Sequence, residues 1–138
     1  MRARQDQAIN TVEALKAAIK RHAPRGREFK FFAQVFQALR IEVNEEIKVL
    51  EEMLEQAAEV LNPQGRLVVM SYHSLEDRPV KNYIQKGKFR GEADKDMFGN
   101  VLKPLRPVNR KIITAQEDEI AENNRARSAK LRIAEKLF

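Results

Sequence analysis

The sequence predicts an α/β fold, and three observations lead to that prediction. A helical pattern of apolar residues fills much of the first sixty positions. A short apolar run at 66–72, rich in β-branched residues, lies between a Pro- and Gly-containing turn and a second helical segment. A similar short run follows at 110–114. With 138 residues, the chain has the length of one modest domain.

The first helix is predicted over Thr11–His22. Its apolar residues recur three and four positions apart, and Thr11 or Asn10 can cap it. It ends before Pro24, and the basic stretch 21–30 then forms a loop.

A long amphipathic helix is predicted over 31–61. One face carries an apolar stripe and the other is acidic, so packing of the stripe must offset repulsion between glutamates four residues apart. The stripe consists of Phe32, Val35, Phe36, Leu39, Val43, Ile47, Leu50, Leu54, Ala57, Ala58 and Leu61. The helix stops at the turn 62–65, where Pro and Gly end it.

The run 66–72 (RLVVMSY) is predicted to be a buried, parallel strand, because helices precede and follow it. Two starts are open for the next helix, which extends to Gln85. If Ser74 caps it, Pro79 falls at the fifth position and deletes a hydrogen bond. If Asp77 caps it, Pro79 lies in the first turn, where it is tolerated.

The remaining elements are shorter. A polar loop at 86–109 leads to a strand at 110–114 (RKIIT), and a short helix is expected at 116–123. The segment 128–136 (SAKLRIAEK) can be a helix or a strand, and its alternation favours a strand. In a strand, Lys130 and Arg132 share the face opposite Leu131 and Ile133.

Composition narrows the function classes. The net charge is +6, and the basic residues gather in 1–30 and 66–111, on either side of an acidic helix. This asymmetry suits contact with a polyanion such as nucleic acid, although a solvated basic surface looks the same. There is no cysteine, no apolar run long enough for a membrane span and no secretory signal pattern. We expect a cytoplasmic protein without metal.

Three segments resemble one enzyme family: FQALRIEVNEE (36–46), SYHSLEDR (71–78) and NNRARSAKLRIAEK (123–136). They are similar to blocks of the S-adenosylmethionine-dependent 16S rRNA (cytosine-N4) methyltransferases, and the PQGRLVV and KPLRPVNRK stretches keep the family order. The resemblance implies the C-terminal portion of a Rossmann-like class I methyltransferase. Residues 1–38 would end an inserted helical substrate domain, and residues 39–138 would belong to the catalytic domain. The three strands would be the fifth, sixth and seventh of the sheet, in the order 5-7-6.

The family's glycine-rich cofactor loop has no counterpart in these 138 residues. The resemblance therefore implies S-adenosylmethionine as the cofactor of the full-length enzyme, with no cofactor-binding residue in this chain. We expect the isolated chain to be inactive. Asn124 and Pro79 also depart from the family pattern, since the family more often has proline and an aliphatic residue at these positions.

Methyl transfer to a cytosine amine requires the base to be fixed and a proton to be accepted. By the resemblance, His73, Ser74 and Asp77 are the candidate catalytic residues, because they directly follow the carboxyl end of a strand, where ligands bind in such folds. Each also has a structural interpretation. Ser74 and Asp77 can be helix caps, Asp77 can pair with Arg78, and a lone histidine beside a strand is often structural.

The chain contains further candidates for contact with substrate or RNA. Tyr72 or Phe98 could stack on an extruded base, although both types are commonly core residues. Arg40 and Asn44 share a helix face that suits one phosphate or one neighbouring carboxylate. Arginines and lysines near the C-terminus, Arg132 among them, could hold rRNA phosphates. The candidate set is Arg40, Asn44, Tyr72, Glu76, Arg78, Arg125, Arg127 and Lys130.

Three functions remain open from sequence. The chain can be part of the methyltransferase, a non-catalytic RNA-binding module, or a helical interaction protein that uses the 31–61 stripe. The expected partner is 16S rRNA or the small ribosomal subunit. An exposed sheet edge at 66–72 would also invite pairing between chains, so we expect a dimer or a larger assembly.

Overall fold

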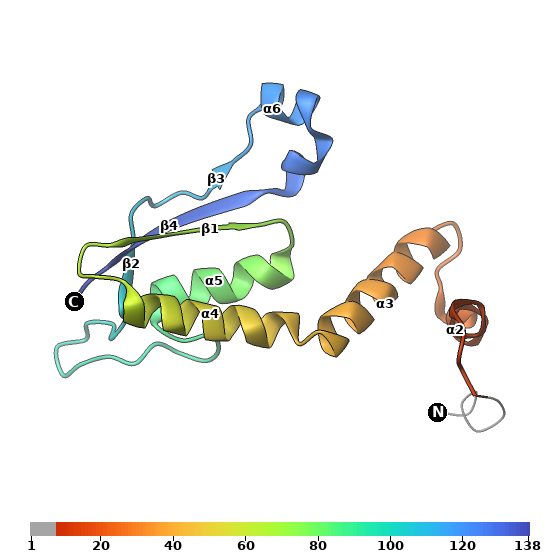
Figure 1. Ribbon diagram of the computed structural model, residues 1–138, viewed down its shortest axis with the longest axis horizontal. Coiled ribbons are helices and arrows are strands. Elements are labelled where there is room, and N and C mark those ends of the chain that lie inside the picture. The colour runs from red at the N-terminus through yellow and green to blue at the C-terminus, as the bar shows by residue number, and fades with distance from the viewer. Residues whose placement is uncertain (1–7) are drawn as a thin grey trace. The chain divides into compact units, whose positions relative to one another are not determined.

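The computed structural model describes residues 8–138 (Figure 1). The chain divides into two compact units, the first ending at Glu46 and the second spanning Ile47–Phe138. The first unit contains α2 (Val12–Ile19), the 3-10 helix η1 (Lys20–His22) and α3 (Glu28–Val43). The helix predicted at 11–22 is confirmed, with a tightened last turn. Thr11 is its N-cap, since its Oγ1 accepts a hydrogen bond from the Ala14 N–H at 3.1 Å.

The single helix predicted over 31–61 is wrong, because the structure has two helices, α3 and α4 (Glu46–Val60). Between them Glu45 adopts a left-handed backbone conformation with φ of 51°, which no α-helix continues through. The side chains of Arg40 and Asn44 both donate hydrogen bonds to the Glu46 carboxylate across this turn. The apolar stripe runs on through the break, and for that reason the pattern alone did not reveal it.

The second unit is a small sheet with helices. Its remaining elements are β1 (Arg66–Ser71), α5 (Ser74–Lys86), β2 (Leu105–Pro107), β3 (Ile113–Thr114), α6 (Glu117–Glu122), the 3-10 helix η2 (Asn124–Ser128) and β4 (Lys130–Lys136). The helix predicted at 116–123 and the strand favoured for 128–136 are confirmed.

The C-terminal strand organises the sheet. β4 lies between β1 and β2 and is antiparallel to both, and β3 also pairs with β4. Every strand pair within residues 8–138 is antiparallel, so the parallel pairing predicted for β1 is not present there. The reason is that β1 pairs with the distant C-terminal strand rather than with a strand that a helical crossover would supply.

Two boundaries differ from the prediction. The segment 86–109 was predicted to be all loop but contains β2, whose Leu105 is fully buried. The strand predicted at 110–114 is reduced to Ile113–Thr114. β2 ends at Pro107, although the Val108 N–H still donates a hydrogen bond to the Ile133 carbonyl of β4 at 2.9 Å.

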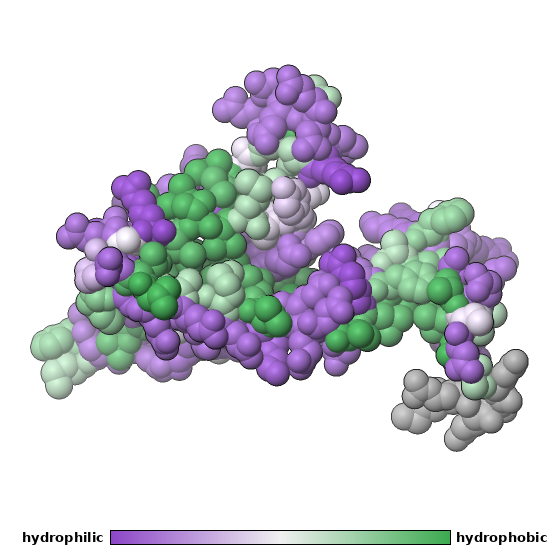
Figure 2. Space-filling model, viewed as in Figure 1, coloured by the Kyte–Doolittle hydropathy of each residue, from purple (hydrophilic) through white to green (hydrophobic). Residues whose placement is uncertain are grey.

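The core lies between one face of the sheet and the helices α4 and α5, which Figure 1 shows on the same side of β1 and β4. It consists of Leu54, Ala58, Val80, Tyr83, Ile84, Leu105 and Ala134. The other face of the sheet is uncovered: Val68 and Met70 are 56% and 54% exposed. Figure 2 shows a hydrophobic surface over this part of the molecule.

In the part of the chain that the structure describes, no helix combines the length and apolar character needed to cross a membrane.

Candidate functional site

The predicted site begins where β1 passes into α5. β1 ends at Ser71, which is buried, and α5 begins at Ser74. His73 is the N-cap residue in an extended conformation, and its carbonyl accepts hydrogen bonds from the N–H groups of Glu76 and Asp77. Neither of the two predicted caps, Ser74 or Asp77, is used. The helix nevertheless contains Pro79 in its interior, where the ring removes one backbone donor.

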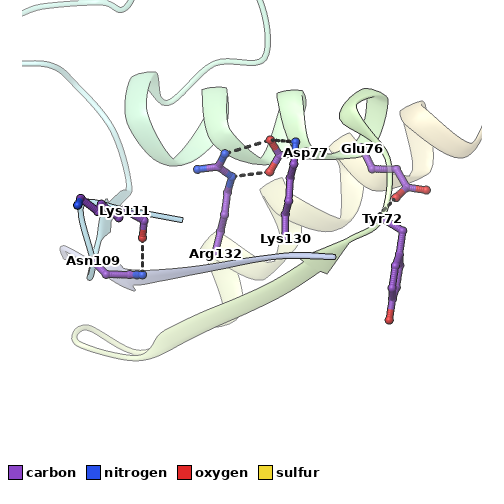
Figure 3. Close-up of polar contacts among 7 residues, drawn as sticks. All are labelled: Tyr72, Glu76, Asp77, Asn109, Lys111, Lys130 and Arg132. Carbon is purple, nitrogen blue, oxygen red and sulfur yellow. Dashed lines mark hydrogen bonds and ion pairs between the residues drawn. The ribbon is translucent and has the colours of Figure 1, made fainter. Parts of the chain in front are cut away.

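Glu76 holds the end of the strand. Its Oε2 accepts a hydrogen bond from the Tyr72 N–H at 3.2 Å (Figure 3). The Tyr72 ring is about half exposed, and its hydroxyl lies 3.3 Å from the Met70 sulfur. Tyr72 is thus a surface residue beside the turn and not a core residue.

Asp77 joins α5 to β4. Its Oδ1 and Oδ2 accept hydrogen bonds from Nε and Nη2 of Arg132 at 2.7 and 3.0 Å, and Lys130 Nζ lies 3.7 Å from Oδ2 (Figure 3). The side chains of Asp77 and Arg132 are only 11% and 19% exposed. The bidentate geometry explains why these two groups can be buried together. The partner of Asp77 is therefore Arg132, and the predicted pairing with Arg78 is wrong.

This contact also decides what the Asp77 carboxyl can do. Hydrogen bonds from Arg132 lower its pKa below the usual 3.8, against the opposing effect of burial, and the charges of Arg132, Lys130 and Lys81 lower it further. A carboxylate with a lowered pKa is a weak proton acceptor at neutral pH. The geometry favours a positioning role for Asp77 over a catalytic one.

His73 and Ser74 present their side chains to solvent at the carboxyl end of β1. No hydrogen bond of either side chain occurs within residues 8–138. Arg78 is also exposed, one residue after Asp77 on α5. These three side chains are placed where a ligand could reach them.

The candidates in the first unit form their own cluster. Arg40 contacts the Glu46 carboxylate through Nε at 2.9 Å and Nη2 at 3.0 Å, and Asn44 Nδ2 donates to it at 3.2 Å. These contacts lower the pKa of Glu46. The sequence predicted that this helix face binds either a phosphate or a neighbouring carboxylate. In the structure it binds the carboxylate of Glu46.

The C-terminal cations divide into two kinds. Arg125 and Arg127 lie on η2, are exposed, and form no ion pair within the described residues. Lys130 and Arg132 lie on β4 and face Asp77. The role of Arg132 was missed, since it was grouped with possible phosphate contacts. Sequence alternation gave no signal for this contact, because it predicts that Leu131 and Ile133, and not Lys130 and Arg132, lie on the buried face of the strand.

Among the described residues, no three histidine, cysteine or acidic side chains gather as potential metal ligands.

Fold and site together define an α/β unit with exposed polar side chains at the carboxyl end of a strand, the usual place for a ligand in enzymes of this class. The chain belongs to the MraW methylase family, whose family model matches residues 1–137.

Curated relatives support the assignment. The chain is 56% identical over 128 residues to a protein named ribosomal RNA small subunit methyltransferase H from Cytophaga hutchinsonii, covering 93% of this chain and 43% of the relative. Proteins of the same name from Parabacteroides distasonis and Amoebophilus asiaticus are each 52% identical, over 137 and 134 residues, covering 99% and 97% of this chain and 45% and 43% of the relatives. The chain thus spans less than half the length of these relatives.

Proposed function

We propose that this chain is part of an rRNA methyltransferase that transfers a methyl group from S-adenosylmethionine to the N4 amine of a cytosine in 16S rRNA. The observation that carries the proposal is the identity of more than 50% over nearly the whole chain to relatives named ribosomal RNA small subunit methyltransferase H. The proposed location follows from the substrate and is the cytoplasm.

The sheet supports this assignment. We propose that β1, β4 and the β2/β3 segment are the fifth, seventh and sixth strands of the complete methyltransferase sheet, and that residues 1–38 end its inserted helical domain. The uncovered apolar face and the unpaired edge of β1 within residues 8–138 suit a sheet that continues beyond these strands.

The residues present do not fit the cofactor. Two strand-to-helix connections occur among the described residues, from β1 to α5 and from β3 to α6. Neither contains a glycine, and both helices have acidic residues in the first turn. The adenosine part of S-adenosylmethionine needs close approach to the backbone, which glycine permits. The carboxylate of its methionine part would be repelled by acidic residues in the first helical turn. We therefore derive no step through S-adenosylmethionine from this chain, and we propose that the chain alone is inactive.

What the chain supplies is a set of side chains for the target base and the RNA. We propose that His73 and Ser74 contact the cytosine, with His73 able to accept a proton, and that Tyr72 offers a face for stacking. Glu76 fixes the strand end, and Asp77 holds α5 against β4. Arg78, Arg125 and Arg127 are free of ion pairs within residues 8–138 and are available to phosphates.

A chimera tests the proposal. The N-terminal part of the Cytophaga hutchinsonii relative is fused to this chain, and methyl transfer to undermethylated small subunits is measured, with the intact relative as the positive control. We expect the chimera to methylate N4 of one cytosine, the chain alone to be silent, and His73→Ala to lower the rate in the chimera. Activity of the relative but not of a folded, cofactor-binding chimera would contradict the proposal. RNA binding without any transfer would favour the non-catalytic module.

The expected self-association has its own test. An exposed strand edge and apolar face favour pairing with a second copy, so the isolated chain should scatter light as a dimer or larger species. Met70→Lys should reduce the molar mass measured by light scattering, because it places a charge on the apolar face. Glu92→Lys, on a distant loop, should leave that mass unchanged. A strictly monomeric wild-type chain would contradict this expectation.

A further inference from the structure

A second cationic surface lies away from the β1–α5 turn, in a shallow cleft between α5 and the loop 108–112. Its polar lining comes from Lys81 and Gln85 on α5, from Asn109, Arg110 and Lys111 on the loop, and from Arg132 on β4. Its apolar lining comes from Ile84, Pro107, Ile112, Leu131 and Ile133. The cationic side chains around this cleft suit an anionic ligand.

The loop that carries two of these cations is held in place. Asn109 Nδ2 donates a hydrogen bond to the Lys111 carbonyl at 2.8 Å, and the Val108 N–H donates to the Ile133 carbonyl at 2.9 Å (Figure 3 shows the first bond). The loop interrupts one edge of the sheet, with β2 before it and β3 after it, and both strands pair with β4. The backbone at Arg110 and Lys111 is therefore anchored to the sheet on both sides of the loop, which lowers the cost of ordering the loop around a ligand.

The charges around the cleft are not balanced. The Asp77 carboxylate lies beside this cleft, and both of its oxygens already accept hydrogen bonds from Arg132. Lys130 and Lys81 add further positive charge near the same carboxylate. No ion pair of Arg110 or Lys111 is formed within residues 8–138, and the nearby Glu135 pairs with Arg106 at 2.6 Å. The cleft thus has an excess of positive charge, which an anionic ligand would neutralise.

We propose that this cleft binds the phosphate backbone of the RNA substrate, with Lys81, Arg110 and Lys111 as the contacts. The inference rests on the proposed function, because it assigns the anion to RNA. A backbone contact of this kind positions the substrate without reading its sequence. It would add a second point of attachment beside the exposed residues at the β1–α5 turn.

Two measurements on the whole 138-residue chain test it. First, a short single-stranded RNA is titrated into labelled protein, and amide shifts are followed by NMR. We expect the largest shifts at Lys81 and at 109–112. Second, affinity for a small-subunit rRNA fragment is measured by fluorescence anisotropy over a range of salt concentrations. Lys81→Ala/Arg110→Ala/Lys111→Ala should weaken binding roughly tenfold and reduce the salt slope by about 2 to 3.

The matched control is Arg66→Ala/Lys95→Ala/Lys103→Ala, which removes the same charge from the first residue of β1 and from two residues of the loop between α5 and β2. It should leave affinity within about twofold, since these residues lie outside the cleft. Circular dichroism verifies that both triple variants are folded.

The outcomes separate the inference from the proposed function. Equal losses of RNA affinity in both triple variants would contradict RNA binding by the cleft and leave rRNA binding by the chain intact. Equal amide shifts with a polyglutamate peptide would have the same meaning. If the wild-type chain does not bind the rRNA fragment but the short RNA still shifts the amide signals of the cleft, the result supports RNA binding by the cleft and contradicts the proposed function. If neither RNA binds, both fall.

Discussion

Removing either partner of the Asp77–Arg132 pair should destabilise the second unit strongly. Breaking a buried ion pair costs about 3–5 kcal/mol, whereas an exposed pair contributes at most about 1 kcal/mol. The two side chains are 11% and 19% exposed, and Lys130 remains near Asp77 in the Arg132 variant. We therefore expect Asp77→Ala and Arg132→Ala each to lower the free energy of unfolding by about 2–3 kcal/mol.

Urea denaturation followed by circular dichroism measures this loss. With a slope of about 1–3 kcal/mol per molar urea for a chain of this size, the midpoint should fall by roughly 1–2 M. The matched control is Glu135→Ala, which removes the more exposed pair with Arg106 and should cost under about 1 kcal/mol. The double variant Asp77→Ala/Arg132→Ala should cost less than the sum of the single variants by at least about 1 kcal/mol.

The reasoning is refuted if Asp77→Ala costs no more than Glu135→Ala, or if the two single losses simply add. Either result would mean that the bidentate contact contributes nothing beyond its surface counterpart, and that β4 and α5 are held together by apolar packing alone.

The other predictions concern pH, packing and backbone. The folded-state pKa of Asp77 is lowered, so its contribution to stability is complete above about pH 4 to 5 and is lost as pH falls through the folded pKa; Asp77→Asn should flatten the acid limb of a stability profile. Leu54→Ala, at a fully buried position, should cost about 2–5 kcal/mol in urea melts, against under about 1.5 kcal/mol for Met53→Ala on the same helix. Gly87 and Gly91 both have positive φ, but a Cβ at Gly87 would lie 2.7 Å from the Leu102 carbonyl oxygen, whereas Gly91 faces open space. Gly91→Ala should therefore cost about 1 kcal/mol and Gly87→Ala clearly more, and equal midpoints would contradict the steric argument.

Local patterns predicted most of the secondary structure. The helix at 12–19, the strand at 66–71 and the C-terminal strand follow from apolar periodicity, which is a property of neighbouring residues. The break at Glu45 did not follow, because a positive φ at a glutamate has no compositional signature. The strand at Leu105–Pro107 was missed for a related reason, since a three-residue strand that ends in proline resembles a loop.

The candidate site was predicted in part. The sequence placed His73, Ser74 and Asp77 at the carboxyl end of a strand, and they lie there. It did not pair Asp77 with Arg132, because 55 residues separate them and only the strand order brings them together. The two residues are neighbours because Arg132 lies opposite Val69 in the β1–β4 register, on the sheet face that α5 covers.

The pattern of β4 shows what the sheet still lacks. Its inward face carries the charged residues Lys130 and Arg132 toward Asp77, and its outward face carries Leu131 and Ile133. An ordinary half-buried strand has the opposite arrangement, with apolar residues inward and polar residues outward. The outward residues pair across the ladder with Met70 and Val68, which are also apolar and exposed, so the face is continuous. A continuous exposed apolar face marks a surface that another layer or chain covers, and it supports our proposal that this sheet has a second covering layer in a larger protein.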